Sequence, residues 1–452
     1  MIGFDTIGNA TLIGYDDVPV LVTDPWIKGS AYFGSWRLTN IIPAEQMDAI
    51  GRTRYVWFSH AHPDHLNGES LETLRDKEIL LPDHVGSRVY QDLSKLGFQA
   101  RILPERQWVE LSRHIRIFCV TDFYQNAALL VDINGTLLIN LNDCIERGWG
   151  RTLRRIARTY KTVYLLKLCG FGDADMMNFF SEEGQRIPPQ AAVNMGRRQI
   201  GKILSLYADL YHTTHVVPFS SFHQLQREDS VWARQYETPR AAYKVGFDSK
   251  RAHIFDPFVR VNCETGELRN LCPPPTGDSV LPPEAFGDSW AEPLEKDEQV
   301  RLAKYIREKE MLFDYFGFIR FRVGGRDTTI DLNPKHRNRG ITFEVPRNSL
   351  MTAVQYEVFD DLLIGNFMKT TLHGCESLYP HFNPVVPKYA DNGHAQTKEE
   401  VERYLATYRS RAPIEYMASA FEQDAHRIFR KFVREDSTLF KVASKAYCFV
   451  RR

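Results

Sequence analysis

Four side chains of metal-binding type fall within six positions near the start of the chain. In WFSHAHPDHLNG, residues 57–68, they are His60, His62, Asp64 and His65. The apolar run before them predicts a short buried strand, and the segment after them has the composition of a helix. Imidazole nitrogens and carboxylate oxygens are ligands of zinc, iron and manganese. A polar turn with chance histidines is the other interpretation, and the density of ligand types favours a metal site.

The spacing within this loop predicts two metal positions. Side chains repeat every two residues along a strand, so His60 and His62 leave its end on the same side. Asp64 and His65 fall on the turn into the helix and are aimed at a second point. One short loop therefore supplies ligands for two ions.

An HxHxDH motif after a strand resembles the metallo-β-lactamase superfamily. The resemblance implies an αββα sandwich with a dinuclear site along one sheet edge, completed by ligands from later loops. Asp143, in NDC after the hairpin strand TLLINL, matches the bridging carboxylate, and His223, at the end of VVPFSSFH, matches the last histidine. The position that usually carries a further histidine holds Asp122 in this chain.

A second resemblance is to CMP-N-acetylneuraminate hydroxylase. It rests on TDPWIKGSAYFGSW (23–36), SHAHPDHL, the hairpin ending in NDC, VVPFSSF and FDDLLIGNFM (359–368), and runs from about residue 1 to about residue 385. That hydroxylase begins with a Rieske iron–sulfur domain, and this sequence has no Cys-x-His pairs to hold such a cluster. The sialic-acid substrate is therefore not carried over.

Asp122 decides which metal the sequence favours. The predicted ligands are four imidazoles and three carboxylates: His60, His62, Asp64, His65, Asp122, Asp143 and His223. Replacing a neutral ring by a carboxylate favours iron or manganese over zinc. The diiron β-hydroxylase of the chloramphenicol pathway resembles this chain in carrying a carboxylate there. The alternative is that Asp122, shorter than histidine, only caps a turn.

The sequence thus predicts a nonheme dinuclear-iron oxygenase that hydroxylates a small molecule with O2. In this hypothesis His60, His62 and Asp122 hold one iron, Asp64, His65 and His223 hold the other, and Asp143 bridges them. The electrons come from a separate electron-donor protein or from the substrate, since no flavin or iron–sulfur motif is visible.

Asp24 in TDPW is the third catalytic candidate, with Asp122 and Asp143. Its carboxylate could accept a hydrogen bond from a ligand imidazole and fix the tautomer of that ring. The competing interpretation is an aspartate in a turn before proline.

A dinuclear hydrolase of the phosphodiesterase, lactonase or amidase type is the alternative function. In it two metals, zinc or manganese as well as iron, lower the pKa of a bridging water so that it attacks a carbonyl carbon or phosphorus. This chemistry needs no electron source. The choice between the two functions rests on metal identity.

Composition excludes several other classes. Lys plus Arg and Asp plus Glu both number 57 in 452 residues, so no net charge favours a nucleic-acid or membrane-surface partner. The seven cysteines include no CxxC pair, which argues against a disulfide framework and fits a reducing compartment. The N-terminal MIGFDTIGNATLIG reads as strand and not as a leader. We expect a cytoplasmic protein without membrane contact.

Patterning predicts an α/β chain in three parts. Residues 1–245 alternate strands and helices and form the metallo-β-lactamase-like domain, with a hairpin at Asn134-Gly135. Residues 246–298 are rich in Pro and Gly and predict an irregular connection. Residues 299–452 predict a smaller α/β domain that covers the site and selects the substrate.

Overall fold

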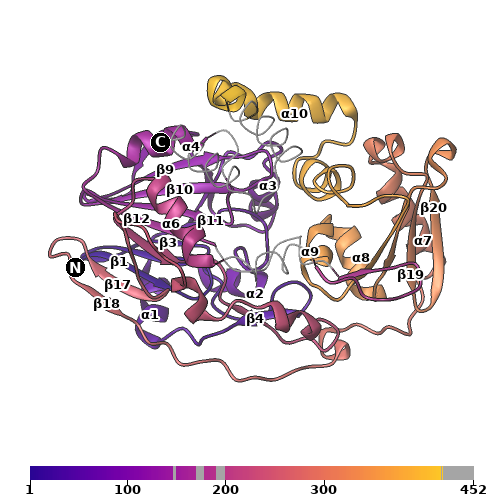
Figure 1. The fold of residues 1–452 in the computed structure, drawn as a ribbon, viewed down its shortest axis with the longest axis horizontal. Helices are drawn as coiled ribbons and strands as arrows, with labels where there is room; N and C mark the ends of the chain where they lie inside the picture. The colour runs from indigo at the N-terminus through magenta and orange to yellow at the C-terminus, as the bar shows by residue number, and fades with distance from the viewer. Residues whose placement is uncertain (146–148, 169–177, 190–198, 419, 421–452) are drawn as a thin grey trace.

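The first of two large sheets begins with the N-terminal strands. The computed structural model describes residues 1–145, 149–168, 178–189, 199–418 and 420 (Figure 1). This sheet has eight strands in the order β18-β17-β1-β2-β3-β5-β6-β7. In chain order they are β1 (Ile2–Ile7), β2 (Thr11–Asp16), β3 (Val18–Thr23), β5 (Tyr55–Trp57), β6 (Glu78–Leu81), β7 (Ala100–Ile102), β17 (Val259–Asn262) and β18 (Leu268–Asn270).

The second sheet is built around the predicted hairpin. Its seven strands run in the order β16-β14-β12-β11-β10-β9-β8. They are β8 (Trp108–Glu110), β9 (Ile115–Thr121), β10 (Ala127–Ile133), β11 (Thr136–Asn142), β12 (Thr162–Lys167), β14 (His215–Pro218) and β16 (His253–Ile254). Ile133 pairs with Thr136, and Asn134 and Gly135 between them have φ of 49° and 81°, the left-handed values of a two-residue hairpin turn.

The two sheets pack face to face, and helices cover their outer faces. Along β10, Leu129 and Val131 enter the core between the sheets together with Phe4 of β1, whereas Ala128 and Leu130 point to the outer core. Both faces of β10 are therefore buried, as in a strand of a four-layer sandwich. The covering helices are α1 (Ala44–Arg52), α2 (Gly68–Leu71), α3 (Arg88–Lys95), α4 (Gly150–Ala157) and α6 (Ile200–Leu210) (Figure 1). The predicted αββα architecture is confirmed.

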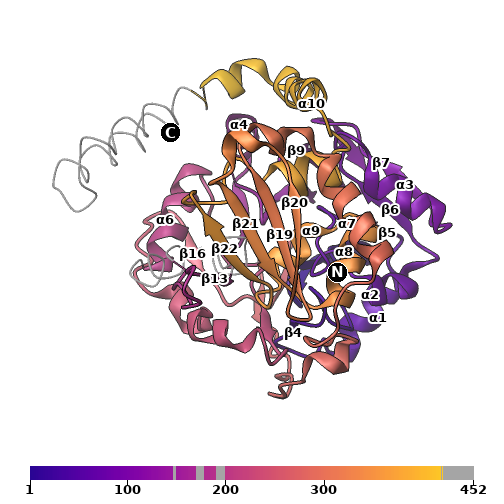
Figure 2. The ribbon, with the colours of Figure 1, turned by 90° about the vertical axis from the view of Figure 1, so that its right-hand side faces the viewer.

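A smaller α/β unit follows. Its five-stranded sheet has the order β13-β22-β21-β19-β20 and faces the viewer in Figure 2. Ile319, Phe321 and Val323 alternate with half-buried residues, so one face of β19 packs on the helices. The elements are β13 (Asn178–Phe180), α7 (Lys296–Arg307), β19 (Phe318–Val323), β20 (Arg326–Asp331), β21 (Gly340–Glu344), α8 (Arg347–Tyr356), α9 (Phe359–Ile364), β22 (Lys369–His373) and α10 (Lys398–Arg411).

The domain boundaries differ in two places from those drawn on the sequence. Segment 246–298, expected as an irregular connection, contributes β16, β17 and β18 to the two large sheets, because edge strands there still had free hydrogen-bonding groups. β13, from the first predicted domain, pairs with β22 of the C-terminal sheet.

Two helix predictions are answered in part. Of the helical segment expected over 182–212, α6 (Ile200–Leu210) confirms the second half, residues 182–189 form a turn and irregular structure and not a helix, and 190–198 lie outside the described residues. The helix expected over 413–433 lies mainly outside the described residues.

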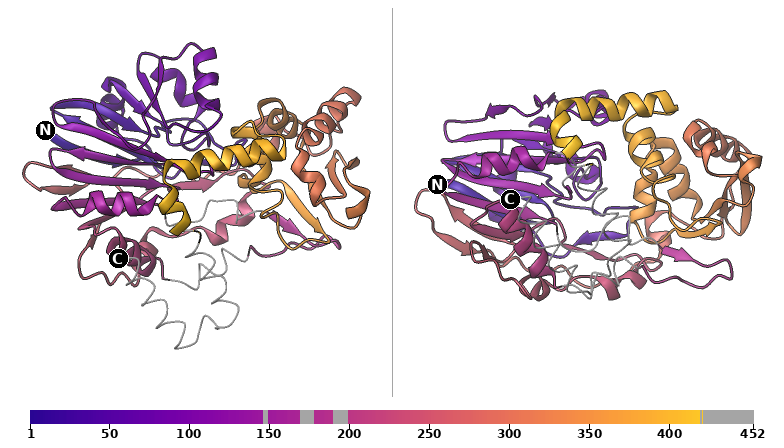
Figure 3. Two further views of the ribbon diagram at one scale, coloured as in Figure 1. Left: turned by 90° about the horizontal axis from the view of Figure 1, so that it is seen from above. Right: turned by 45° about the horizontal axis from the view of Figure 1, so that its top comes forward.

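The C-terminal unit lies beside one end of the sandwich, and α10 runs back over that end (Figures 1 and 3). Tyr404 of α10 donates a hydrogen bond to the carbonyl of Phe123 at 2.7 Å, and Tyr408 accepts one from the amide of Val85 at 3.0 Å. The loops at this end of the sandwich are therefore held by both units. Among the described residues, no helix is both long and apolar enough to cross a membrane.

Candidate metal centre

The ligand-rich loop follows β5 and ends at α2. Asn67 caps α2 by accepting a hydrogen bond from the amide of Ser70 at 3.0 Å. Parallel pairing of β5 with β3 and β6 places the loop at the carboxyl end of the strands. Strand and cap together fix both ends of the loop, so its side chains have defined directions.

Three predicted ligands form the group that geometry marks as metal-binding within the described part of the chain. His60, His65 and Asp143 bring one donor atom each to within 4.8 Å of one another. Asp143 directly follows β11, and its two oxygens face different partners. Oδ2 lies 3.9 Å from Nε2 of His60, and Oδ1 lies 3.4 Å from Nε2 of His65. A carboxylate between two imidazoles is the arrangement expected of a bridge.

The other two residues of the motif extend this group on opposite sides. Nδ1 of His62 lies 2.8 Å from Nε2 of His60, and Oδ2 of Asp64 lies 3.5 Å from Nε2 of His65. One pair of donors therefore stands on each side of Asp143. The two metal positions expected from the spacing stay a prediction.

Asp24 lies where a carboxylate supports a ligand imidazole. It is fully buried, and its Oδ2 lies 3.0 Å from Nδ1 of His65, whose Nε2 faces Asp143. Its Oδ1 accepts a hydrogen bond from the amide of Ser59 at 2.7 Å. The Ser59 hydroxyl lies 2.8 Å from Nδ1 of His60. Both imidazoles thus have a partner on the nitrogen that points away from Asp143.

Two further groups fix the Asp64 carboxylate. The Tyr32 hydroxyl donates to Oδ1 at 2.5 Å, and the Asn9 amide donates to Oδ2 at 2.9 Å. Burial and the nearby Asp64 raise the pKa of Tyr32 well above its ordinary value, so its proton stays in this bond. On the other side, the Ser220 hydroxyl donates to Oδ1 of Asp143. The carboxylates are therefore oriented before any ion binds.

His223 begins the short strand β15 (His223–Leu225) and stacks on Trp36, with ring centroids 3.4 Å apart and planes 4° apart. Its Nδ1 is buried and has no hydrogen-bond partner among the described residues, which is costly unless another ligand completes it. Burial lowers the pKa of His223 to about 3, although the Asp143 carboxylate acts in the opposite direction. The ring is thus neutral, as a metal ligand must be.

Asp122 follows β9 but does not join the group of three. Its Oδ1 accepts hydrogen bonds from the amides of Tyr124 at 2.8 Å and Asn126 at 3.3 Å, the geometry of a turn. β9 and β11 both pair antiparallel with β10, so Asp122 and Asp143 leave the same edge of the sheet. The turn interpretation describes its contacts, and its role as a ligand stays a prediction.

The surroundings shift the pKa values of His60 and His65 in opposite directions. Burial, and then the neighbouring His65 and His62, lower the pKa of His60 well below its ordinary value. For His65 the carboxylates of Asp64, Asp143 and Asp24 outweigh burial and raise the pKa well above that value. When His65 is protonated, the ring is a cation among three carboxylates. A metal ion bound to the neutral ring would balance the same negative charges.

Sequence reasoning missed a contribution from the C-terminal unit. Oδ2 of Asp360, in α9, lies 2.8 Å from Nε2 of His62 and 2.6 Å from Nζ of Lys388. Asp360 lies in FDDLLIG, one of the stretches that resemble CMP-N-acetylneuraminate hydroxylase, but the sequence assigned no role to this residue. Nothing in the local pattern indicated that this aspartate reaches a loop almost three hundred positions earlier, because only the folded chain brings them together.

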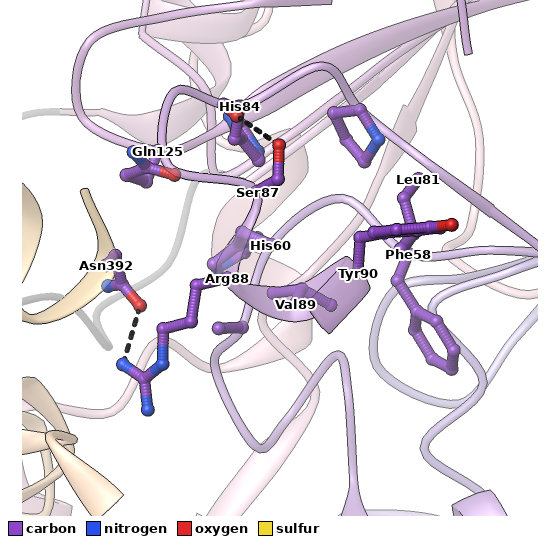
Figure 4. A pocket seen from close by; sticks show the side chains of 12 residues that line it. Phe58, His60, Leu81, His84, Ser87, Arg88, Val89, Tyr90, Gln125 and Asn392 are labelled. Carbon is purple, nitrogen blue, oxygen red and sulfur yellow. Dashed lines mark hydrogen bonds between the residues drawn. The ribbon is translucent and has the colours of Figure 1, made fainter. Parts of the chain in front are cut away.

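His84 is a second missed residue. With His60, Ser87, Arg88 and Gln125 it lines a narrow pocket beside the metal loop, as we call the ligand-rich loop between β5 and α2 (Figure 4). Its Nε2 lies 3.2 Å from the carbonyl oxygen of Ser59, and its Nδ1 is buried with no hydrogen-bond partner in the part of the chain that the structure describes. Phe58, Leu81 and Val89 contribute apolar side chains to the lining of this pocket.

Replacing Asp24 by asparagine tests its support of His65. Asparagine can still accept the Ser59 amide but presents no carboxylate to Nδ1 of His65. We expect metal affinity to fall by about 10- to 100-fold, the usual cost of losing a partner of a ligand imidazole. Competition with a chromophoric chelator measures it. Asp132→Asn, at a mostly buried carboxylate of β10, is the control, and an equal fall in both variants would contradict a specific role.

Comparison with known proteins gives partial matches. No family model matches the chain. Over 141 residues, 29% of the chain, it is 28% identical to cytidine monophosphate-N-acetylneuraminic acid hydroxylase of Asterias rubens. Over 146 residues it is 25% identical to the protein of that name from Sus scrofa. The matched stretches span 22% and 34% of these two relatives, so most of each relative has no counterpart in the match.

Two solved structures share a low similarity with the chain. A metallo hydrolase from Ignicoccus hospitalis has a TM-score of 0.33 and 14% identity, covering 57% of this chain and 96% of its own. CmlA, a diiron beta-hydroxylase from Streptomyces venezuelae, has a TM-score of 0.34 and 14% identity, covering 48% of this chain and 44% of its own.

Two sheets packed between helices, with an HxHxDH loop at the carboxyl end of the strands, define the metallo-β-lactamase fold, and this chain has that fold. Within it, the chain is homologous over part of its length to CMP-N-acetylneuraminic acid hydroxylase.

Proposed function

We propose that this chain is a dinuclear-iron oxygenase that oxidises a small molecule with O2. The observation that carries the proposal is Asp143, whose two oxygens face His60 on one side and His65 on the other. His62 would join His60, and Asp64 and His223 would join His65. The unpartnered, neutral His223 supports its place in this set.

Iron is proposed because the site is rich in carboxylates. Asp64 and Asp143 lie in the cluster, and Asp122 is proposed as the third carboxylate, on the side of His60 and His62. Its position at the same end of the strands as Asp143 supports this. Carboxylate ligands favour iron or manganese over zinc. The partial homology to proteins named as hydroxylases agrees with oxygen chemistry.

The residues of the chain perform three tasks in this proposal. Two irons would supply the binding and reduction of O2, with electrons from a separate donor protein or from the substrate. The Tyr32 hydroxyl donates a hydrogen bond to Asp64, and the Ser220 hydroxyl donates one to Asp143. These bonds fix the orientation of both carboxylates. Buried aromatic rings such as Trp36 exclude water from the side of His223.

A dinuclear hydrolase is the second candidate, and the same geometry favours it. A carboxylate that serves two metal positions is sufficient for activation of water, and the reaction needs no electrons. It would act on an ester, amide or phosphodiester with zinc or manganese in the site.

Metal loading separates the two candidates. The chain is loaded with Fe(II) without oxygen and then exposed to O2, and Mössbauer spectra are recorded before and after. The oxygenase predicts two irons per chain and a spectral change on exposure. A colourless protein that holds two zinc ions and does not change on exposure to O2 would contradict the oxygenase proposal. Anaerobic turnover of an ester or phosphodiester would establish the hydrolase.

Two variants of Asp122 test its proposed role. Asp122→His should shift the preference of the site towards zinc and abolish the response to O2, since a neutral ring replaces a carboxylate. Asp122→Asn keeps an oxygen for the Tyr124 amide and should lose iron affinity without loss of thermal stability. Metal analysis and thermal unfolding measure both. Unchanged iron binding in Asp122→Asn would show that Asp122 serves only the turn.

A further inference from the structure

The contact of Asp360 with the metal loop crosses from one unit of the molecule to the other. His62 leaves the loop after β5, and Asp360 leaves α9 of the C-terminal unit. Asp360 is 4% exposed, and its Oδ2 lies 2.8 Å from Nε2 of His62. The other ring nitrogen, Nδ1, lies 2.8 Å from Nε2 of His60. His62 is thus held between the metal cluster and the second unit.

Lys388, in the helical segment Val385–Asn392, completes this contact. It is 8% exposed, and its Nζ lies 2.6 Å from Oδ2 of Asp360 and 3.1 Å from Nε2 of His62. A buried ion pair commonly gains little stability over apolar side chains of similar size. Stability alone is therefore a weak reason for burying this pair against an imidazole.

The three groups allow two positions for the proton of the neutral ring. With the proton on Nε2, His62 donates to Asp360, and the lone pair of Nδ1 faces His60 and is available to a metal ion. With the proton on Nδ1, Nε2 accepts from Lys388, and Nδ1 has no lone pair to offer. The carboxylate favours the first arrangement, and the ammonium favours the second.

We propose that Asp360 is a positioning residue of the metal centre. It selects the Nε2-protonated form of His62, so the metal position shared by His60 and His62 reaches its full affinity only when the C-terminal unit is docked. This rests on the proposed dinuclear centre. A carboxylate that accepts a hydrogen bond from a metal-ligating histidine commonly orients that ring. Here the carboxylate comes from a different unit of the molecule.

The docking of α9 is firm enough for this task. Before the helix, the carbonyl of Glu357 accepts a hydrogen bond from Arg88 at 2.7 Å. After the helix, the carbonyl of Gly365 accepts one from the Ser35 hydroxyl at 2.5 Å. Arg88 and Ser35 belong to the sandwich, so α9 is tied to it at both ends, with Asp360 between the ties.

The test is a metal titration of the full chain and its Asp360→Asn variant. Fe(II) is added without oxygen in competition with a chromophoric chelator, which resolves the affinities of the two positions. The wild-type chain should bind two ions tightly. In Asp360→Asn one position should weaken by at least about 10-fold while the other stays within about twofold, because only His62 loses its partner.

Two controls separate positioning from general damage. Glu298→Gln removes another buried carboxylate of the same unit, in α7, which contacts Arg347 at 2.8 Å and has no contact with α9 or with His62 among the described residues. It should leave both affinities unchanged. Lys388→Met removes the ammonium that can donate to Nε2 of His62. In this variant the metal position of His60 and His62 should bind at least as tightly as in the wild type.

The outcomes are distinct. Two tight ions in Asp360→Asn, or equal weakening of both positions, would overturn the positioning role while leaving the dinuclear centre intact. A wild-type chain that binds no metal would overturn the proposed function, and this inference with it.

Discussion

Asp143→Ala should bind no metal ion tightly at either position. The variant removes the one carboxylate whose oxygens face both His60, at 3.9 Å, and His65, at 3.4 Å. Loss of a partner that only supports a ligand costs about 10- to 100-fold in affinity, so loss of a shared ligand should exceed about 100-fold at both positions. Anaerobic chelator competition and metal analysis of the purified chain measure it.

The Ser220→Ala chain is the matched control. It removes the hydroxyl that donates to Asp143 but leaves the carboxylate in place. Its affinities should fall by less than those of Asp143→Ala, and by a similar factor at both positions. Retention of one tight ion in Asp143→Ala would contradict a shared ligand, because Asp143 would then serve only one side of the centre.

The part of the centre that sequence predicts best is the part built by local structure. HAHPDH needs only a strand just before it and a helix just after it; β5 ends at Trp57, three residues before the expected end, and α2 begins at Gly68. Asp143 needs only the hairpin with its Asn134-Gly135 turn, whose residue types dictate the turn conformation. These residues could be assigned because each follows directly from the end of a strand.

The part that sequence does not predict depends on contacts between distant segments. Asp360 reaches His62 only because α9 docks on the sandwich, and no periodicity or spacing encodes that docking. The strand β13 could not be assigned to the C-terminal sheet for the same reason, since its partner β22 lies almost two hundred residues further on. Asp122 shows a different limit: an aspartate after a strand fits a turn and a ligand equally well, and its residue type does not separate them.

Arg227 is a buried cation that contacts residues of both units, so its replacement should destabilise the molecule. Its side chain is fully buried and contacts Asp229 at 2.8 Å, Asp288 at 2.7 Å and the carbonyl of Phe33 at 2.9 Å. Its guanidinium carbon lies 4.0 Å from the centroid of the Phe367 ring. Arg227→Ala should lower the free energy of unfolding by about 3–5 kcal/mol, because it leaves the buried carboxylate of Asp288 without its cation.

Urea unfolding of wild type and variant at one fixed metal concentration measures this loss. Arg322→Ala is the control, since Arg322 contacts Asp327 at the same 2.7 Å but on the surface, with 43% and 37% of the two side chains exposed. An exposed pair contributes about 0–1 kcal/mol, so this variant should unfold close to the wild type. Equal losses in the two variants would refute burial as the cause. A large loss confined to Arg227→Ala would support the buried Arg227–Asp288 pair as the cause, because the exposed pair of equal length would then contribute little.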